Sequence, residues 1–157
     1  MIKSIKYFVN QFNANISLDE NLIVKKDNRY FLVSEHLKRL IAKDFFFAGT
    51  YLGKIKNGEF FPGFSLLRMI AEKKANKIIV NKKAEWLFIC RRDIFKQGIL
   101  RVVGSQRKGD CSLILNRHGE CLGFGKVLCN LNKDKRRVVV KNISDIGDFL
   151  RREIQEV

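Results

Sequence analysis

The sequence predicts an α+β protein built in two parts. Its 157 residues are enough for one domain or two small ones, and 46% hydrophobic residues with 13 Phe supply the side chains of real cores. Up to about Ala75, helical periodicity alternates with hairpins of short strands, which predicts an antiparallel sheet with helices. From Lys77 onward, short strands separated by regular turns are typical of a small barrel.

The first part is predicted from apolar periodicity and turn residues. Asp27-Asn28 and Asn57-Gly58 tolerate tight hairpin turns, and Ser34 is a good helix N-cap. The predicted elements are a helix over Met1–Phe12, strands over Leu22–Lys26 and Arg29–Val33, a helix after Ser34 with Leu37, Leu40 and Ile41 on its apolar face, a strand over Phe45–Lys56 that returns through Glu59–Phe61 to Pro62, and a helix over Ser65–Ala75.

The second part is predicted as strands with helices near its start and end. Between the two parts there is no linker rich in Gly, Pro or Ser, so we expect domains at 1–75 and 76–157 that pack together. The predicted elements are a strand over Lys77–Val80, a helix over Lys82–Cys90 with Trp86, Leu87 and Phe88 partly buried, a bent connector over Ile94–Ile99, strands over Leu100–Val103, Cys111–Leu115, Cys121–Cys129 and Arg137–Lys141, and a helix over Asp145–Glu153.

The charge of the chain points to a polyanionic partner. Thirty-one Lys and Arg against 16 Asp and Glu leave a net charge of +15, with a pI near 9.9. Nucleic acid is the leading candidate, because each neutralised phosphate releases counterions. The alternative is a Lys-rich surface that serves stability or reflects an AT-rich genome. No apolar run approaches the ~18–20 residues that span a bilayer, and Met1–Phe8 is too interrupted for a signal peptide, so we expect no membrane partner.

Residues for metal, cofactor or catalytic chemistry do not form a recognisable pattern. Cys90, Cys111, Cys121 and Cys129 never form a Cys-x-x-Cys pair, so we expect buried, reduced thiols. The alternative is that Cys111 and Cys121 face each other across adjacent strands, but a disulfide between them would be unusual without an export signal. His36 and His118 belong to no triad or metal motif. Gly123-Phe124-Gly125 satisfies no phosphate-binding fingerprint and favours close backbone approach instead. We therefore expect a protein that is not an enzyme and holds no cofactor.

Two sets of residues carry a family resemblance. The stretch from Lys77 to Val127, with its Lys-rich strand, the run Ala84–Phe95 and the closing Gly-Glu-Cys-Leu-Gly-Phe-Gly-Lys-Val, resembles a PUA domain, an RNA-binding module. The hairpin Gly49–Lys54, the strand Gly123–Lys126 and the ending Asp145–Glu153 are similar to small two-domain ribosome-biogenesis proteins of archaea and eukaryotes, whose yeast member is called nuclear import protein seven.

That resemblance implies a fold, a function and partners. The second half would be a PUA pseudo-barrel of mixed strands that binds single-stranded, U- and A-rich pre-rRNA. The protein would be a non-enzymatic, monomeric factor in large-subunit maturation, and its first half would dock other ribosome-assembly factors such as exosome components. It would act in the cytoplasm if archaeal and in the nucleus or nucleolus if eukaryotic.

The candidate RNA-binding residues are basic. The family carries a basic cluster on the strand before the last helix, and the matching positions here are Arg136, Arg137 and Lys141, while a fourth family position falls on Ser144. In a regular strand Arg137, Val139 and Lys141 would share a face. The remaining candidates are Lys135, Arg91, Arg92, Lys96, Arg151 and Arg152. The alternative for the strand cluster is that its charges are solvated at a sheet edge, and the alternative for Arg151 and Arg152 is that they interact with the dipole of the last helix.

The aromatic side chains of the chain have two interpretations. Phe45–Phe47, Phe60-Phe61 and Trp86 could stack on bases, but strand alternation favours core packing.

One alternative function is a specificity subunit of an RNA-modification enzyme. The absence of a catalytic Asp motif argues against it. Another is a translation-initiation PUA protein, which should carry a different first half.

Overall fold

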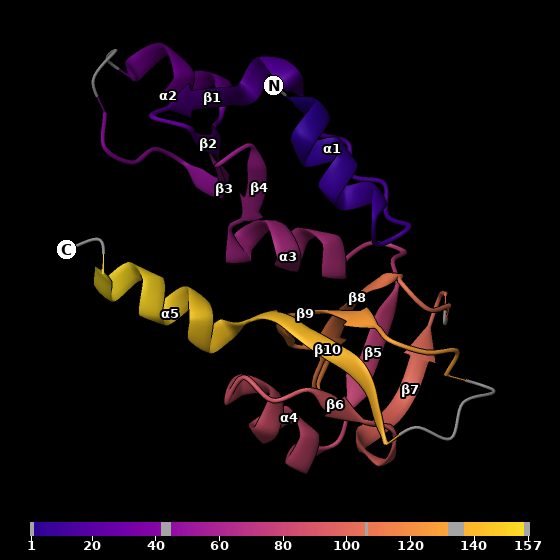
Figure 1. Ribbon diagram of the computed structural model, residues 1–157. Helices are drawn as coiled ribbons and strands as arrows, with labels where there is room; N and C mark the ends of the chain where they lie inside the picture. Colours follow the sequence, from indigo (N-terminus) through magenta and orange to yellow (C-terminus); the bar gives the residue numbers. More distant parts are fainter. Residues whose placement is uncertain (1, 42–44, 106, 132–136, 156–157) are drawn as a thin grey trace.

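The structure is a computed structural model that describes residues 2–41, 45–105, 107–131 and 137–155 (Figure 1). For Ile2 and residues 152–155 it describes the backbone only. Two sheets, one from each half of the chain, are joined through a layer of helices (Figure 1). None of the helices in the described ranges is both long enough and apolar enough to cross a membrane.

The N-terminal half is an antiparallel sheet in the order β1-β2-β3-β4 with three α-helices. Its hairpins form where the chain has residues that accept positive φ, with Asp27 and Asn28 at 47° and 64° and Asn57 and Gly58 at 53° and 79°. Ser34 caps α2 by accepting a hydrogen bond from the Leu37 backbone N–H. The elements are α1 (Ile2–Asn10), η1 (Glu20–Leu22), β1 (Ile23–Lys26), β2 (Arg29–Leu32), α2 (Glu35–Leu40), β3 (Thr50–Lys56), β4 (Glu59–Pro62) and α3 (Phe64–Ala71).

The C-terminal half is a curled, mixed sheet in the order β6-β10-β9-β8-β5-β7. Strands β5 and β8 pair in parallel, whereas the other pairs are antiparallel. The elements are β5 (Lys77–Val80), α4 (Lys82–Ile89), β6 (Ile94–Phe95), η2 (Lys96–Gly98), β7 (Ile99–Val103), β8 (Cys111–Leu115), β9 (Cys121–Val127), β10 (Val138–Asp145) and α5 (Ile146–Gln155). The predicted α+β class, with an antiparallel sheet followed by a mixed, barrel-like sheet, is confirmed.

The two halves share one hydrophobic core. The expectation that they pack together, which the sequence gives because no flexible linker separates them, is confirmed. Phe124 of β9 lies edge-on to Phe8 of α1 and to Phe12 in the turn after it, with ring centroids 5.5 and 5.6 Å apart. Asn76, near which the sequence predicts a domain boundary, donates its backbone N–H to the Phe12 carbonyl at 2.7 Å. A second core fills the curled sheet, and Ala84 and Phe88 of α4 close it. The domain ranges 1–75 and 76–157 stay a prediction.

Four predicted core residues lie on the surface instead. Phe46 is 78% exposed and Phe47 59% exposed, because β3 begins only at Thr50 and the alternation expected from Phe45 does not apply. Leu40 of α2 is also exposed, since Leu37 of this short helix and Ile41 directly after it pack against the small cluster around Phe31 instead.

Trp86 is the fourth of these residues, at 68% exposure. Ala84 and Phe88 are four apart and both face the core. Trp86 lies between them in sequence, which places it about 200° around the helix from either neighbour. The expectation that Trp86 is partly buried is therefore wrong, whereas Phe88 is fully buried.

The cysteines differ in exposure more than the sequence predicts. All four are free thiols; Cys121 and Cys129 are buried, Cys111 is half-buried, and Cys90 at the end of α4 is exposed, which contradicts the expectation for that residue. In the β8–β9 pair Cys111 lies opposite Lys126 and Cys121 opposite Leu115. Cys111 and Cys121 therefore stand at opposite ends of the pair and do not face each other.

Candidate nucleic-acid interface

Strand β10 is where the basic segments predicted from separate parts of the sequence come together. The Lys96 backbone N–H donates to the Arg137 carbonyl at 2.8 Å, next to the β6–β10 pairing. Both residues are exposed, as are Arg92 before β6 and Lys141 within β10. Of the other candidates, Lys135, Arg136 and the side chain of Arg152 lie outside the part of the chain that the structure describes.

Irregular pairing decides which way the β10 side chains face. The register shifts between Val138 and Val140, which interrupts the strict alternation of a regular strand. Val139 is consequently buried completely, although Arg137 and Lys141 on either side of it are exposed. The expectation that these three residues share one face is wrong for Val139.

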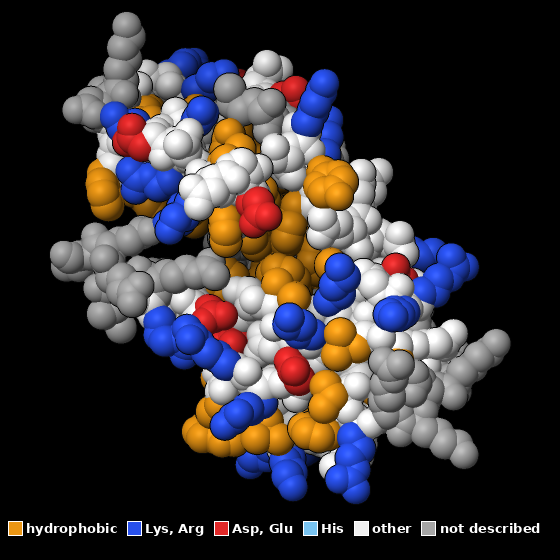
Figure 2. Space-filling view, in the orientation of Figure 1, with side chains coloured by type: hydrophobic (Ala, Val, Ile, Leu, Met, Phe, Trp, Pro, Cys, Tyr) orange, Lys and Arg blue, Asp and Glu red, His pale blue; other side chains and the backbone are white. Residues whose placement is uncertain are grey.

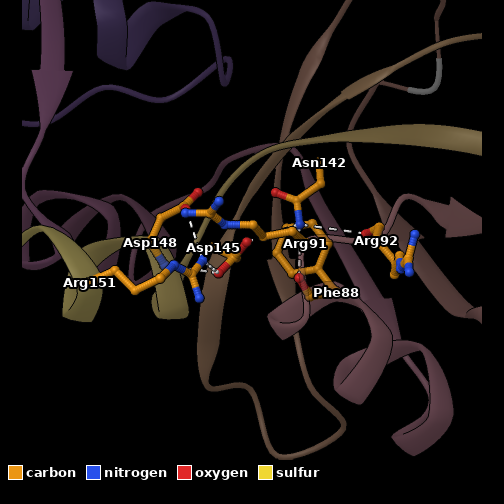
Figure 3. Close-up of polar contacts among 7 residues, drawn as sticks. All are labelled: Phe88, Arg91, Arg92, Asn142, Asp145, Asp148 and Arg151. Atoms are coloured by element: carbon orange, nitrogen blue, oxygen red, sulfur yellow. Dashed lines mark hydrogen bonds and ion pairs between the residues drawn. The ribbon is translucent and has the colours of Figure 1, made fainter.

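Asn142 of β10 holds the end of α4 and the turn that follows it (Figure 3). Its Nδ2 donates to the Phe88 carbonyl at 2.8 Å and to the Arg92 carbonyl at 3.5 Å, and its backbone N–H donates to Asp93 Oδ1 at 2.9 Å. Arg91 adopts a positive φ of 64°, the left-handed conformation in which many helices end. Sequence analysis missed Asn142; its signal is an amide in a strand otherwise rich in Val and Ile.

Arg91 and Arg151 meet two carboxylates beside this turn (Figure 3). Arg91 lies 2.7 Å from Asp148 Oδ1, and Arg151 lies 2.8 Å from the same oxygen and 3.5 Å from Asp145 Oδ1. The Asp145 side chain is fully buried and caps the start of α5 by accepting from the Asp148 backbone N–H at 3.0 Å. These ion pairs fasten the end of α4 to the first turns of α5.

The paired arginines are locally neutralised but still reach solvent. Two guanidiniums face two carboxylates, so the cluster carries no formal excess charge. The side chains of Arg91 and Arg151 nevertheless remain 61% and 44% exposed, which leaves donor positions open to water. The contacts of these two arginines give them a structural role at the junction of α4 and α5. Their role in RNA binding stays a prediction.

Asp148 shows the electrostatic effect of the cluster. Partial burial raises the pKa of its carboxyl, but the hydrogen bond from Arg151 and the charge of Arg91 outweigh that effect and hold the pKa below its usual value. The carboxylate form is therefore favoured at neutral pH, and the Arg91–Asp148–Arg151 arrangement is stable there.

A second basic pair spans β10 and its neighbour β9. Lys126 of β9 is the direct cross-strand partner of Lys141 of β10, and both side chains are exposed. Neither forms an ion pair with any residue in the described ranges. Figure 2 shows Lys and Arg side chains over β9 and β10, below a hollow lined by hydrophobic side chains. Lys126 was missed as a site residue, although it ends the Gly-Phe-Gly-Lys stretch that carries part of the resemblance.

Glycines allow β9 and β10 to approach closely enough to form this pair. A Cβ at Gly123, whose φ is 144°, would lie 2.1 Å from the Ser144 carbonyl oxygen. A Cβ at Gly125 would lie 2.7 Å from the Lys141 carbonyl oxygen. The interpretation of these glycines as positions of close backbone approach is confirmed. Ser144, where the resemblance places a further basic residue, is buried in this chain.

An antiparallel sheet with helices, packed against a curled mixed sheet with a basic strand edge, defines a protein of the PUA-domain class. The comparisons with known proteins agree. Residues 76–154 match the family model described as "UPF0113 PUA domain", and the chain belongs to this family. A UPF0113 protein of Archaeoglobus fulgidus is 35% identical over 86 residues, 50% of this chain; the match spans about half, 47%, of that relative's length.

Two solved structures resemble the fold over nearly the whole chain. A conserved PUA-domain protein from Thermoplasma acidophilum aligns with a TM-score of 0.61 at 19% identity, covering 96% of this chain and 92% of that one. A PUA-domain structure from Aeropyrum pernix aligns with a TM-score of 0.62 at 16% identity, covering 99% and 88%. At these identities the similarity supports the arrangement of both halves and says nothing further about function.

Proposed function

We propose that this protein is a non-enzymatic RNA-binding factor of ribosome biogenesis that holds single-stranded, U- and A-rich pre-rRNA on the outer surface of its PUA sheet. The observation that carries the proposal is the exposed pair Lys126 and Lys141, directly opposite each other on β9 and β10. Like charges in this position destabilise a sheet unless an anion lies between them. A phosphate of an RNA backbone is an anion suited to that place.

The rest of the basic edge supports the same partner. Arg137 and Lys96 lie next to each other at the β6–β10 edge, and Arg92 is held nearby through the contacts of Asn142. Separated exposed cations along one edge suit the repeated phosphates of a single strand better than one small anion. Among the residues that the structure describes, the groups with shifted pKa values are a paired carboxylate and two half-buried or buried thiols, and none of them favours acid–base catalysis.

The biological setting follows from the resemblance described above. The similarity to the family of nuclear import protein seven supports large-subunit maturation and pre-rRNA processing as the process. The archaeal relative supports an archaeal source and hence the cytoplasm. The exposed Phe46, Phe47 and Leu40 of the N-terminal half give other assembly factors, including exosome components, a surface to dock on. We propose that the protein itself is a monomer.

The test is a salt-dependent titration of a fluorescent U-rich oligonucleotide of about 12 nucleotides, a length within the range bound by single-strand proteins. The wild type is compared with a Lys126→Ala/Lys141→Ala variant. We expect weaker binding and a slope of log K against log salt that is shallower by up to ~0.7 for each lost phosphate contact.

A matched control removes the same charge elsewhere. Lys82→Ala/Lys83→Ala deletes two exposed lysines from the first turn of α4, on the side of the PUA half away from the N-terminal half (Figure 1). This variant should bind RNA nearly as the wild type does. An equal loss of RNA affinity in both variants would mean that the effect comes from net charge and not from a specific site. If the wild type does not bind RNA, the proposed function is refuted.

A further inference from the structure

A groove lies between helix α1 and the β3–β4 hairpin, outside the PUA half. Its volume is about 520 Å³, within the range of small-ligand sites. Phe8 and Phe60 line it with their rings 5.6 Å apart, and Tyr7 and Lys3 line it from exposed positions on α1. Tyr7 is 71% exposed and belongs to no core cluster, so its ring is accessible to a ligand.

The groove leads to the lysine pair on the PUA sheet. Gln11, which lines the groove, accepts a hydrogen bond through Oε1 from the Cys111 thiol, with 3.6 Å between oxygen and sulfur. Cys111 is the cross-strand partner of Lys126, and Lys126 is the partner of Lys141. Neighbouring strands are ~4.8 Å apart, so Lys126 stands about one strand spacing beyond the residue that Gln11 contacts.

The electrostatics agree with this proximity. Burial raises the pKa of the Cys111 thiol, and the positive charge of nearby Lys126 offsets part of that effect. Figure 2 shows the same arrangement as a hollow lined by hydrophobic side chains between α1 and the N-terminal sheet, with Lys and Arg side chains on the PUA sheet below it. Aromatic and basic groups thus form one continuous surface across the two halves.

The chemistry of the groove fits a nucleobase. A base presents a flat π-face to an exposed aromatic ring such as Tyr7, and stacking of this kind tolerates any base. Ser4, Gln11 and Glu59 also line the groove and supply donors and acceptors for the polar edge of a base. Lys3 at the rim would meet the adjoining phosphate, whereas Glu59 would be unfavourable next to one, which places the base rather than the backbone at the hairpin.

We propose that this groove receives an unstacked base of the RNA strand whose phosphates lie on Lys126 and Lys141, so that the N-terminal half is part of the RNA site. This inference rests on the proposed function and extends it from the PUA half to the junction of the two halves. Charge complementarity favours RNA as the occupant, because the exposed cations Lys126 and Lys141 lie next to the groove.

The experiment combines affinity with the position of contact. U-rich oligonucleotides of about 12 residues carrying 5-iodouridine are titrated against wild type, Tyr7→Ala and Tyr7→Phe, and then photocrosslinked and mapped by mass spectrometry. Tyr7→Ala should weaken binding roughly 5- to 160-fold, as expected for loss of one stacked base, and should leave the salt slope unchanged because no charge is removed. Tyr7→Phe should restore the affinity, and crosslinks should map to α1.

The control is Phe46→Ala, which removes an equally exposed aromatic ring from the N-terminal half at a position that does not line the groove. It should bind RNA as the wild type does. If wild type and the Tyr7→Ala variant bind equally while Lys126→Ala/Lys141→Ala is weakened, the groove is not an RNA site and the proposed function stands. If the wild type fails to bind any of the oligonucleotides, both proposals fall together.

Discussion

Arg91 places its guanidinium 2.7 Å from the carboxylate of Asp148, joining the end of α4 to the first turn of α5. Arg151 shares the same carboxylate from one helical turn further along α5. Two arginines that sequence analysis assigns to RNA therefore have intramolecular partners (Figure 3). Their contribution to stability and their contribution to RNA binding are separable by experiment, since removal of the Asp148 carboxylate should lower stability and should strengthen any contact of these arginines with RNA.

Replacing Asp148 by Asn should lower stability at neutral pH and remove part of its pH dependence. The pKa of Asp148 is lower in the folded state than the ordinary value of 3.8, so its stabilising effect is present above that value and is lost as the pH falls through the folded-state pKa. We expect a loss of ~0.5–1 kcal/mol at pH 7, a modest figure because Arg91 is well exposed, and little difference from wild type at the acid end.

The measurement is urea denaturation at pH 7 and near pH 3, with Arg91→Gln and the double variant completing a mutant cycle. A coupling energy of zero between Arg91 and Asp148 at pH 7 would show that the ion pair does not contribute. Asp148→Asn also releases Arg91 and leaves Arg151 with Asp145 alone, so it should strengthen RNA binding if these arginines reach the strand.

Replacing Asn142 by Ala should destabilise the protein by ~1–3 kcal/mol, because the side-chain amide gives up its hydrogen bonds to the Phe88 carbonyl and to the fully buried carboxylate of Asp145. For a chain of this length that corresponds to a fall in Tm of roughly 3–10 °C. Thermal denaturation of the wild type and the Asn142→Ala variant measures this fall in Tm. Asn10→Ala, at the exposed end of α1, is the control and should stay within about 0.5 kcal/mol of wild type; equal effects in the two variants would contradict the anchoring role of Asn142.

Alanine at Gly123 and at Gly119 should have very different effects. Both glycines have positive φ, 144° and 83°, but a Cβ at Gly119 meets nothing within 4 Å, whereas at Gly123 it meets the Ser144 carbonyl at 2.1 Å. Gly119→Ala should cost ~1–2 kcal/mol through its backbone conformation alone. Gly123→Ala must separate β9 from β10 and should cost more than ~4 kcal/mol. Circular dichroism during chemical denaturation distinguishes them, and similar midpoints would disprove the close approach.

The thiols should react in order of exposure. Iodoacetamide at pH 8 should label Cys90 first and Cys111 more slowly. Cys121 should resist labelling in the folded protein, because burial raises the pKa of its thiol to about 11. Peptide mapping by mass spectrometry gives the order, and all four should react at similar rates in denaturant. Early labelling of Cys121 in native buffer would contradict its buried position.

Local features of the fold were predictable because they depend on residues near one another in the chain. Asp27-Asn28 and Asn57-Gly58 accept the backbone angles of tight hairpins, and Ser34 supplies an N-cap, whatever surrounds them. The β3 strand was predicted too long, because the apolar Phe45–Phe47 run looks like a strand and nothing in the sequence reveals that pairing begins at Thr50.

The sequence by itself determined the α+β class, the two sheets, most element boundaries and the strong positive charge, because turn chemistry, periodicity and composition are local or additive properties. Only the tertiary structure decided that Lys126 faces Lys141, that Arg91 meets Asp148, and that Tyr7 stands at a groove leading to the lysine pair. These relationships depend on strand register, on a bulge in β10 and on the packing of one half against the other. Such long-range contacts are set by the whole core rather than by neighbouring residues.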